Sequence, residues 1–99
     1  IDFALSIAHK SIGRGDVTYA AGCCFQAASC ILQVLFALNR QHWLNEKGAL
    51  ALAETFAVLP ADLKARVERA FGLLSADGAA IQAAIDLLGE VAAENQALV

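Results

Sequence analysis

Apolar residues recur along this chain at the three- and four-residue spacing of amphipathic helices. In residues 2–12 the apolar positions are Phe3, Leu5, Ile7, Ala8 and Ile12, which predicts a short first helix. The run Gly13-Arg14-Gly15 breaks this pattern, and Asp16 follows it. Because an aspartate carboxylate can accept hydrogen bonds from the free amides of a first helical turn, Asp16 is the predicted N-cap of the next helix.

The longest predicted helix spans residues 17–42, a stretch without proline and with Gly22 as its one glycine. A helix of roughly 26 residues would be ~39 Å long. Helical geometry gathers its polar residues into a narrow stripe and leaves the rest of its surface apolar. The stripe consists of Thr18, Gly22, Gln26, Ser29, Gln33 and Arg40. We therefore expect this helix to form the centre of the domain, buried on all but one side.

Three further segments complete the predicted helices. Asn45 can cap a helix over residues 46–58, and Pro60 separates it from a clearly amphipathic helix over residues 61–74. A turn at residues 75–78 precedes a last apolar repeat that runs close to the C-terminus. No segment shows a strand pattern. Short connections favour antiparallel neighbours, so the sequence predicts an all-α, up-and-down bundle of four longer helices plus a short N-terminal helix.

Composition changes this picture in two ways. Hydrophobic residues make up 59% of the chain, and residues 17–38 carry no formal charge, so a membrane span has to be weighed. The polar stripe and the amphipathic later helices argue against lipid exposure, and we expect no membrane contact. A net charge of −3 offers no broad basic field for a nucleic-acid backbone, so nucleic acid is not an expected partner.

The three cysteines indicate the cellular compartment. Cys23, Cys24 and Cys30 lie within one apolar stretch, whereas a secreted disulfide scaffold would spread an even number of cysteines through its loops. We expect buried free thiols in a cytoplasmic protein and no metal site, since no histidine stands at helical spacing from them. The chain starts at Ile1 without a methionine, which predicts that residues 1–99 are one helical domain of a larger protein.

The densest group of polar residues lies at residues 39–47, where two predicted helices meet. Cationic side chains there could converge on an anionic ligand, and Trp43 offers a stacking surface. The structural alternative is that Arg40 and His42 favour the negative end of the helix dipole, Asn45 is a cap and Trp43 covers the core edge. Neither a phosphate-binding glycine loop nor a nucleophile with a base is present, so we expect no catalysis by this chain alone.

Three short motifs resemble the helical C-terminal region of nucleotidyltransferase-like proteins, in the broad superfamily of the aminoglycoside nucleotidyltransferases. They are RGD at residues 14–16, LFALNR at residues 35–40 and NEK at residues 45–47. The resemblance implies an upstream nucleotidyltransferase domain that binds ATP or another nucleoside triphosphate with Mg²⁺. The helical region would close the cleft and bind no cofactor alone. Its implied function is accessory: nucleotide and substrate binding during nucleotidyl transfer onto a small molecule.

The resemblance also implies roles for individual residues. Lys47 would contact the triphosphate as a point charge, Asn39 and Arg40 would line the same cleft, and Asp16 would orient a substrate hydroxyl or amine. The candidate binding residues are therefore Asp16, Asn39, Arg40, Trp43 and Lys47. The alternative function is a non-catalytic helical interaction or dimerisation domain, with a homodimer as its simplest form. A Gly-Ser motif followed by Asp-x-Asp upstream of residue 1 would favour the first function.

Overall fold

The computed structural model describes residues 2–99, apart from the side chains of Asp2, Phe3, Ile7, Lys10 and Ser11. The side chains of the predicted apolar positions Phe3 and Ile7 therefore lie outside the described part of the chain. The elements are α1 (Asp2–Ala8), a 3₁₀ helix η1 (His9–Arg14), α2 (Val17–Leu38), α3 (Ala49–Ala53), α4 (Leu63–Leu73) and α5 (Gly78–Ala97). Residues 2–99 contain no strand, which confirms the predicted all-α class.

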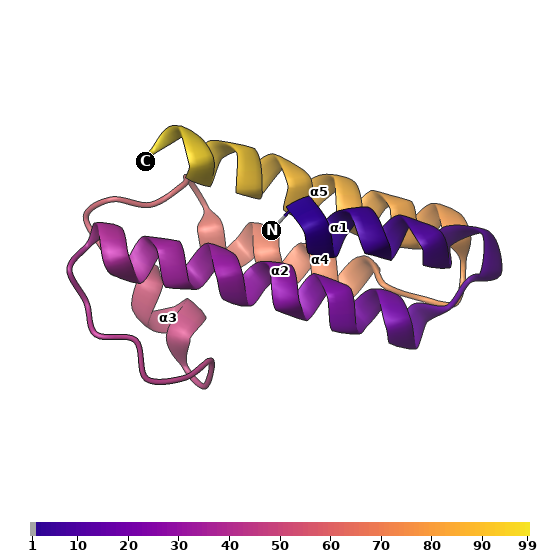
Figure 1. The fold of residues 1–99 in the computed structure, drawn as a ribbon, viewed down its shortest axis with the longest axis horizontal. Coiled ribbons are helices and arrows are strands. Elements are labelled where there is room, and N and C mark those ends of the chain that lie inside the picture. The colour runs from indigo at the N-terminus through magenta and orange to yellow at the C-terminus, as the bar shows by residue number, and fades with distance from the viewer. Residues whose placement is uncertain (1) are drawn as a thin grey trace.

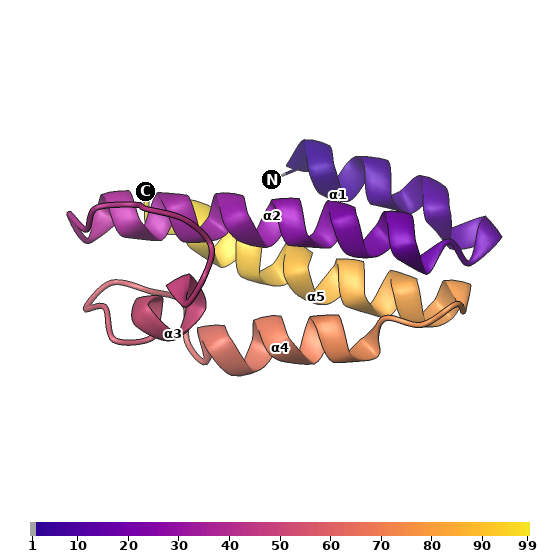
Figure 2. The same cartoon turned by 90° about the horizontal axis from the view of Figure 1, so that it is seen from below.

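The helices α2 and α5 run side by side; α1 packs against both of them, and α4 packs mainly against α5 on the other side of the bundle (Figures 1 and 2). The chain direction reverses from α1 to α2, and again from α4 to α5, as predicted for an up-and-down bundle. The short helix α3 packs beneath the C-terminal half of α2 at one end of the bundle. The resulting body is elongated, with extents of 40 × 25 × 21 Å.

The core lies along α2, as the apolar pattern predicts. Ala20, Cys24 and Ala27 on α2 are fully buried, and their small side chains let neighbouring helices approach closely. The largest apolar side chains that are fully buried come from α2, α4 and α5, namely Ile31, Leu35, Leu63, Ile81, Leu88 and Val91. Three helices thus share one hydrophobic core.

The turn between η1 and α2 explains the Gly-Arg-Gly-Asp sequence in structural terms. The Asp16 carboxylate accepts a hydrogen bond from the Tyr19 amide at 3.2 Å, which confirms the predicted N-cap. Gly15 has a φ of +62°, and a Cβ atom there would lie 3.1 Å from the carbonyl oxygen of Ala76. Glycine is needed at this position because the backbone is left-handed and touches the α4–α5 turn.

The prediction that the long helix continues to residue 42 is wrong. It ends at Leu38, because Arg40 adopts a left-handed φ of +56° and the Gln41 amide turns back to donate to the Phe36 carbonyl at 2.8 Å. A left-handed residue just past a helix is the usual way in which a helix ends. Arg40 therefore does not lie on α2, and the helical part of the polar stripe ends at Gln33.

The predicted helix over residues 46–58 is reduced to one short turn, α3. The backbone before it is irregular: the Asn45 side-chain oxygen accepts the Lys47 amide at 2.9 Å, and Gly48 has a left-handed φ of +73°. Asn45 thus closes a local turn instead of capping a helix, which is a known competing use of this side chain. The next helix also begins later than predicted, at Leu63, after a left-handed Asp62.

Two properties of α2 bear on the expected compartment. Within the described part of the chain, α2 is long and apolar enough to span a membrane, with a mean hydropathy of 1.8, but half of its most apolar window is buried. A soluble core helix passes the same test, so the absence of membrane contact stays a prediction. Cys23 and Cys24 are buried free thiols as predicted, while Cys30 is partly exposed. The pKa of the Cys24 thiol is raised to about 11, mainly because the thiol is buried and to a smaller extent because Cys23 lies nearby.

Candidate functional site

The five predicted binding residues do not form one site. Asp16 lies at the start of α2, whereas the other four follow its C-terminal end. A helix of 22 residues separates them, a length of roughly 33 Å at 1.5 Å per residue. The Asp16 carboxylate is also engaged as the N-cap of α2 and lies 3.9 Å from Arg14. Asp16 therefore shares no cleft with Asn39, Arg40 or Lys47 within this domain.

Asn39 fastens the end of α2 to the segment after α3. Its side-chain nitrogen donates to the carbonyls of Leu35 at 2.8 Å and Val58 at 2.7 Å. Its side-chain oxygen accepts the Val58 amide at 2.9 Å. Both polar atoms of the amide are thus used inside the domain, which gives Asn39 a structural role.

The Asn39→Ala substitution is expected to lower the free energy of unfolding by about 1–2 kcal/mol, because three hydrogen bonds are lost at a partly exposed site. Urea denaturation of the purified domain measures this change. Gln41→Ala is the matched control, because Gln41 is exposed and its one side-chain hydrogen bond is long, at 3.4 Å. Equal stability of both variants and the parent chain would contradict the structural role of Asn39.

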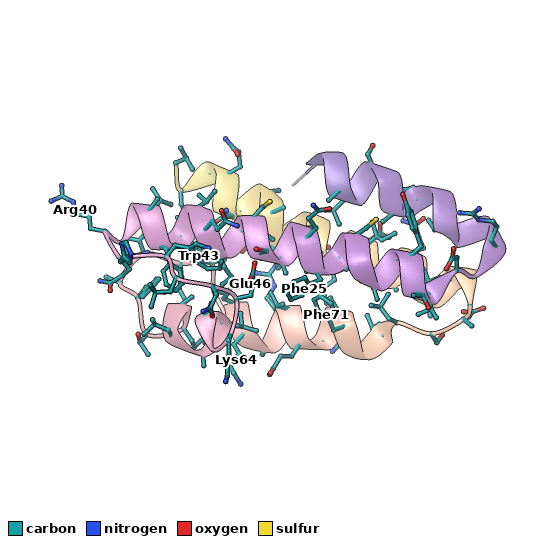
Figure 3. All side chains as sticks on the ribbon, turned by 60° about the horizontal axis from the view of Figure 1, so that its bottom comes forward. Phe25, Arg40, Trp43, Glu46, Lys64 and Phe71 are labelled. Atoms are coloured by element: carbon teal, nitrogen blue, oxygen red, sulfur yellow. The ribbon has the colours of Figure 1, made fainter. Side chains whose placement is uncertain are left out.

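Arg40 and Trp43 point in different directions. Arg40 is exposed and projects from the end of the bundle, away from the other labelled side chains (Figure 3). Trp43 is half-buried and packs edge-on against Phe36, with ring centroids 5.0 Å apart, and Phe36 in turn contacts Phe56 at 4.9 Å. Trp43 therefore anchors the α2–α3 connection to the core edge.

Lys47 lies beside a surface pocket of about 270 Å³, here called the Lys47 pocket. Its lining residues are Phe36, His42, Leu44, Asn45, Lys47, Gly48, Ala49 and Leu52. The side chain of Lys47 is exposed and forms no ion pair with any described residue. Asn39 lines a different depression, next to Thr55 and Ala57. The structure thus brings Lys47 together with His42 and Asn45.

A second pocket, which the sequence did not predict, lies between α2, α3, α4 and the α2–α3 connection. It has a volume of about 320 Å³ and is here called the Phe25 pocket. Its lining residues are Phe25, Ala28, Ser29, Leu32, Glu46, Leu50, Val67, Glu68 and Phe71. An adjoining pocket of about 440 Å³ shares Phe25, Ser29 and Glu46 with it. The two pockets thus adjoin each other along α2, and they are here called together the depression beside α2.

Glu46 is held over this depression by a short polar chain. The side-chain nitrogen of Gln33 donates to Ser29 Oγ at 3.1 Å, and Ser29 Oγ donates to Glu46 Oε1 at 3.2 Å. Ser29 is only 8% exposed, so its hydroxyl needs these partners. Ser29 and Gln33 belong to the polar stripe seen in the sequence, but their partner Glu46 comes from the loop and could not be predicted from helical spacing.

No three described His, Cys, Asp or Glu residues are grouped closely enough to hold a metal ion. Comparisons of the chain with protein-family models, with curated proteins and with solved structures found no match. The fold and surface define an all-α helical bundle in which the α2–α3 connection contributes residues to both the Lys47 pocket and the Phe25 pocket. These two pockets are the candidate binding sites.

Proposed function

We propose that this chain is the accessory nucleotide- and substrate-binding domain of a nucleotidyltransferase-like protein. In this proposal an upstream domain binds ATP or another nucleoside triphosphate with Mg²⁺, and the helical domain contributes one wall of the cleft in which a small molecule is modified. The observation that supports it best is the Lys47 pocket, where an unpaired ammonium group lies beside His42 and Asn45. The NEK motif of the resemblance contributes two of these residues.

The backbone around Lys47 is well placed to present this charge. Trp43 anchors the connection on Phe36, and the Asn45 side chain holds the Lys47 amide. The flexible lysine side chain therefore extends from a fixed backbone position. A lysine ammonium suits a triphosphate because it acts as a compact point charge with three donors. Mg²⁺ would be held by the upstream domain, since the described residues offer no group of metal ligands.

In the full-length protein, Lys47→Ala is expected to weaken ATP binding by about tenfold or more, because a charge-assisted hydrogen bond is lost. Isothermal titration with ATP and Mg²⁺ measures the affinity. Lys64→Ala is the matched control, because Lys64 lies on α4, pairs with Glu68 and does not line the Lys47 pocket. Unchanged ATP affinity in Lys47→Ala would remove Lys47 from the nucleotide site. A full-length protein that binds no nucleotide would overturn the proposed function.

A helical interaction or dimerisation domain is the second candidate function. The observation that favours it is a set of exposed large apolar side chains, namely Tyr19, Phe25, Leu44 and Leu52. Exposed apolar side chains of this size often mark contact surfaces. Sedimentation of the domain at increasing concentration separates the two functions, because a dimerisation domain has to self-associate. The proposed compartment is the cytoplasm for either function, since it keeps free thiols reduced.

A further inference from the structure

The Phe25 pocket combines an apolar interior with an aromatic ring on each side. Its interior consists of Ala28, Leu32, Leu50 and Val67. Phe25 stands on α2 and Phe71 on α4, and both are drawn near Glu46 in Figure 3. Phe25 is 54% exposed, which is unusual for a phenylalanine on the central helix of a bundle. The faces of such rings attract organic cations as well as apolar groups.

The charged side chains that line this pocket are both acidic. Glu46 and Glu68 line it, and no lysine, arginine or histidine does. The nearest basic partner shown for either carboxylate is Lys64, whose ammonium lies 3.3 Å from Glu68 Oε1 but extends to the outside (Figure 3). Each carboxylate uses only its Oε1 atom in hydrogen bonds with described residues. The two Oε2 atoms are thus available to a ligand that donates hydrogen bonds.

We propose that the Phe25 pocket binds a small organic cation, a protonated amine joined to an apolar body. The amine would lie against Glu46 and Glu68, and the body would fill the space between Phe25 and Phe71. A volume of about 320 Å³ falls within the usual range of small-molecule sites. The Phe25 pocket shares no lining residue with the Lys47 pocket, so amine binding there does not depend on the nucleotide site proposed above.

The polar chain supports a ligand-directed role for Glu46. A loop carboxylate would ordinarily be free to turn into solvent, but Ser29, whose Oγ accepts a hydrogen bond from Gln33, donates to this one at the pocket. A group held in place in advance loses less conformational freedom on binding, and this raises affinity. The adjoining pocket, lined by Gln26, Cys30 and Gln33 among others, offers amide groups to a longer or more polar ligand.

The test is a titration of the 99-residue chain with 2-phenylethylamine at pH 7, followed by NMR chemical shifts. Two matched probes separate the contributions: 3-phenylpropanoate carries the opposite charge, and methylamine lacks the apolar body. We expect shifts at Phe25, Glu46 and Phe71 with 2-phenylethylamine, and at least about tenfold weaker binding of both other probes. Absence of binding, or equal binding of the anionic probe, would overturn the proposal.

Glu46→Gln keeps the shape of the side chain and removes its charge, and it is expected to weaken 2-phenylethylamine binding by about tenfold. Glu90→Gln, an exposed change on α5 outside the pocket, is the matched control. If Glu46→Gln does not fold, Phe25→Ala removes an exposed ring without opening the core and should weaken binding similarly. An unchanged affinity for 2-phenylethylamine in whichever of the two variants folds overturns the proposal. A dimer of the parent chain that dissociates on Phe25→Ala also overturns it, because the pocket would then be occupied by a second copy of the chain.

Measuring amine binding and ATP binding in the Lys47→Ala and Glu46→Gln variants tests the two proposed sites separately. Lys47→Ala is expected to leave the affinity for 2-phenylethylamine unchanged, because Lys47 does not line the Phe25 pocket. A loss of amine binding in Lys47→Ala would mean that the two pockets are not separate, and it would overturn the assignment made here. ATP binding by the full-length Glu46→Gln protein reports on the nucleotide site alone.

Discussion

Leu35→Ala is expected to lower the free energy of unfolding by about 3–4 kcal/mol, the largest effect of a single substitution that we predict. Leu35 lies on α2 and has no exposed surface. Truncation removes buried methyl and methylene groups and leaves a cavity, because surrounding side chains fill such a space only partly. A domain of this size has a total stability of about 5–15 kcal/mol, so the substitution would remove a large fraction of it.

Urea denaturation followed by circular dichroism measures the loss in Leu35→Ala. Leu44→Ala is the matched control, because it makes the same chemical change at a side chain that is 79% exposed on the α2–α3 connection. We expect the control to change stability by less than about 0.5 kcal/mol. A difference of under about 1 kcal/mol between the two variants would mean that α2 is not the buried centre of the bundle.

The sequence predicts the fold well where a helix carries its own signals. The start of α2 follows from Asp16 and the preceding glycines, and α5 follows from Asp77, Gly78 and the apolar repeat after them. The end of α2 could not be predicted, because the residue that turns left-handed there is Arg40 instead of a glycine or asparagine. The irregular connection before α3 depends on the Asn45 turn, a local alternative that competes with a helical start.

The candidate site was predicted less well, since it depends on contacts between distant segments. The resemblance implies a ligand-binding role for Asn39, but its side chain bonds Val58, nineteen residues away, and helical spacing cannot predict such a partner. Ser29 was visible as part of a polar stripe, while its partner Glu46 reaches it from a loop seventeen residues later. Helical periodicity thus identifies which residues are polar and where they lie on a helix. It cannot predict the tertiary contacts that give these residues their roles.

Gly78→Ala and Gly89→Ala are expected to change stability in opposite directions, although both place a methyl group on α5. A Cβ atom at Gly78 would lie 2.5 Å from the carbonyl oxygen of Ile12, and that oxygen belongs to the backbone of η1. Because a backbone atom cannot turn aside, η1 and α5 would have to separate. We expect the free energy of unfolding to fall by about 2 kcal/mol, as in other overpacked sites.

Gly89 lies in the middle of α5, and a Cβ atom there would meet nothing within 4 Å. Alanine at that position should raise the free energy of unfolding by about 0.5–1 kcal/mol, because glycine loses more backbone freedom than alanine when a helix forms. Urea denaturation of the two variants side by side measures both changes. A stability gain in both would show that η1 does not pack on the first turn of α5. A stability loss in both would show that the middle of α5 is closely covered. The expected opposite changes in the free energy of unfolding therefore test the packing at both ends of this comparison, Gly78 and Gly89.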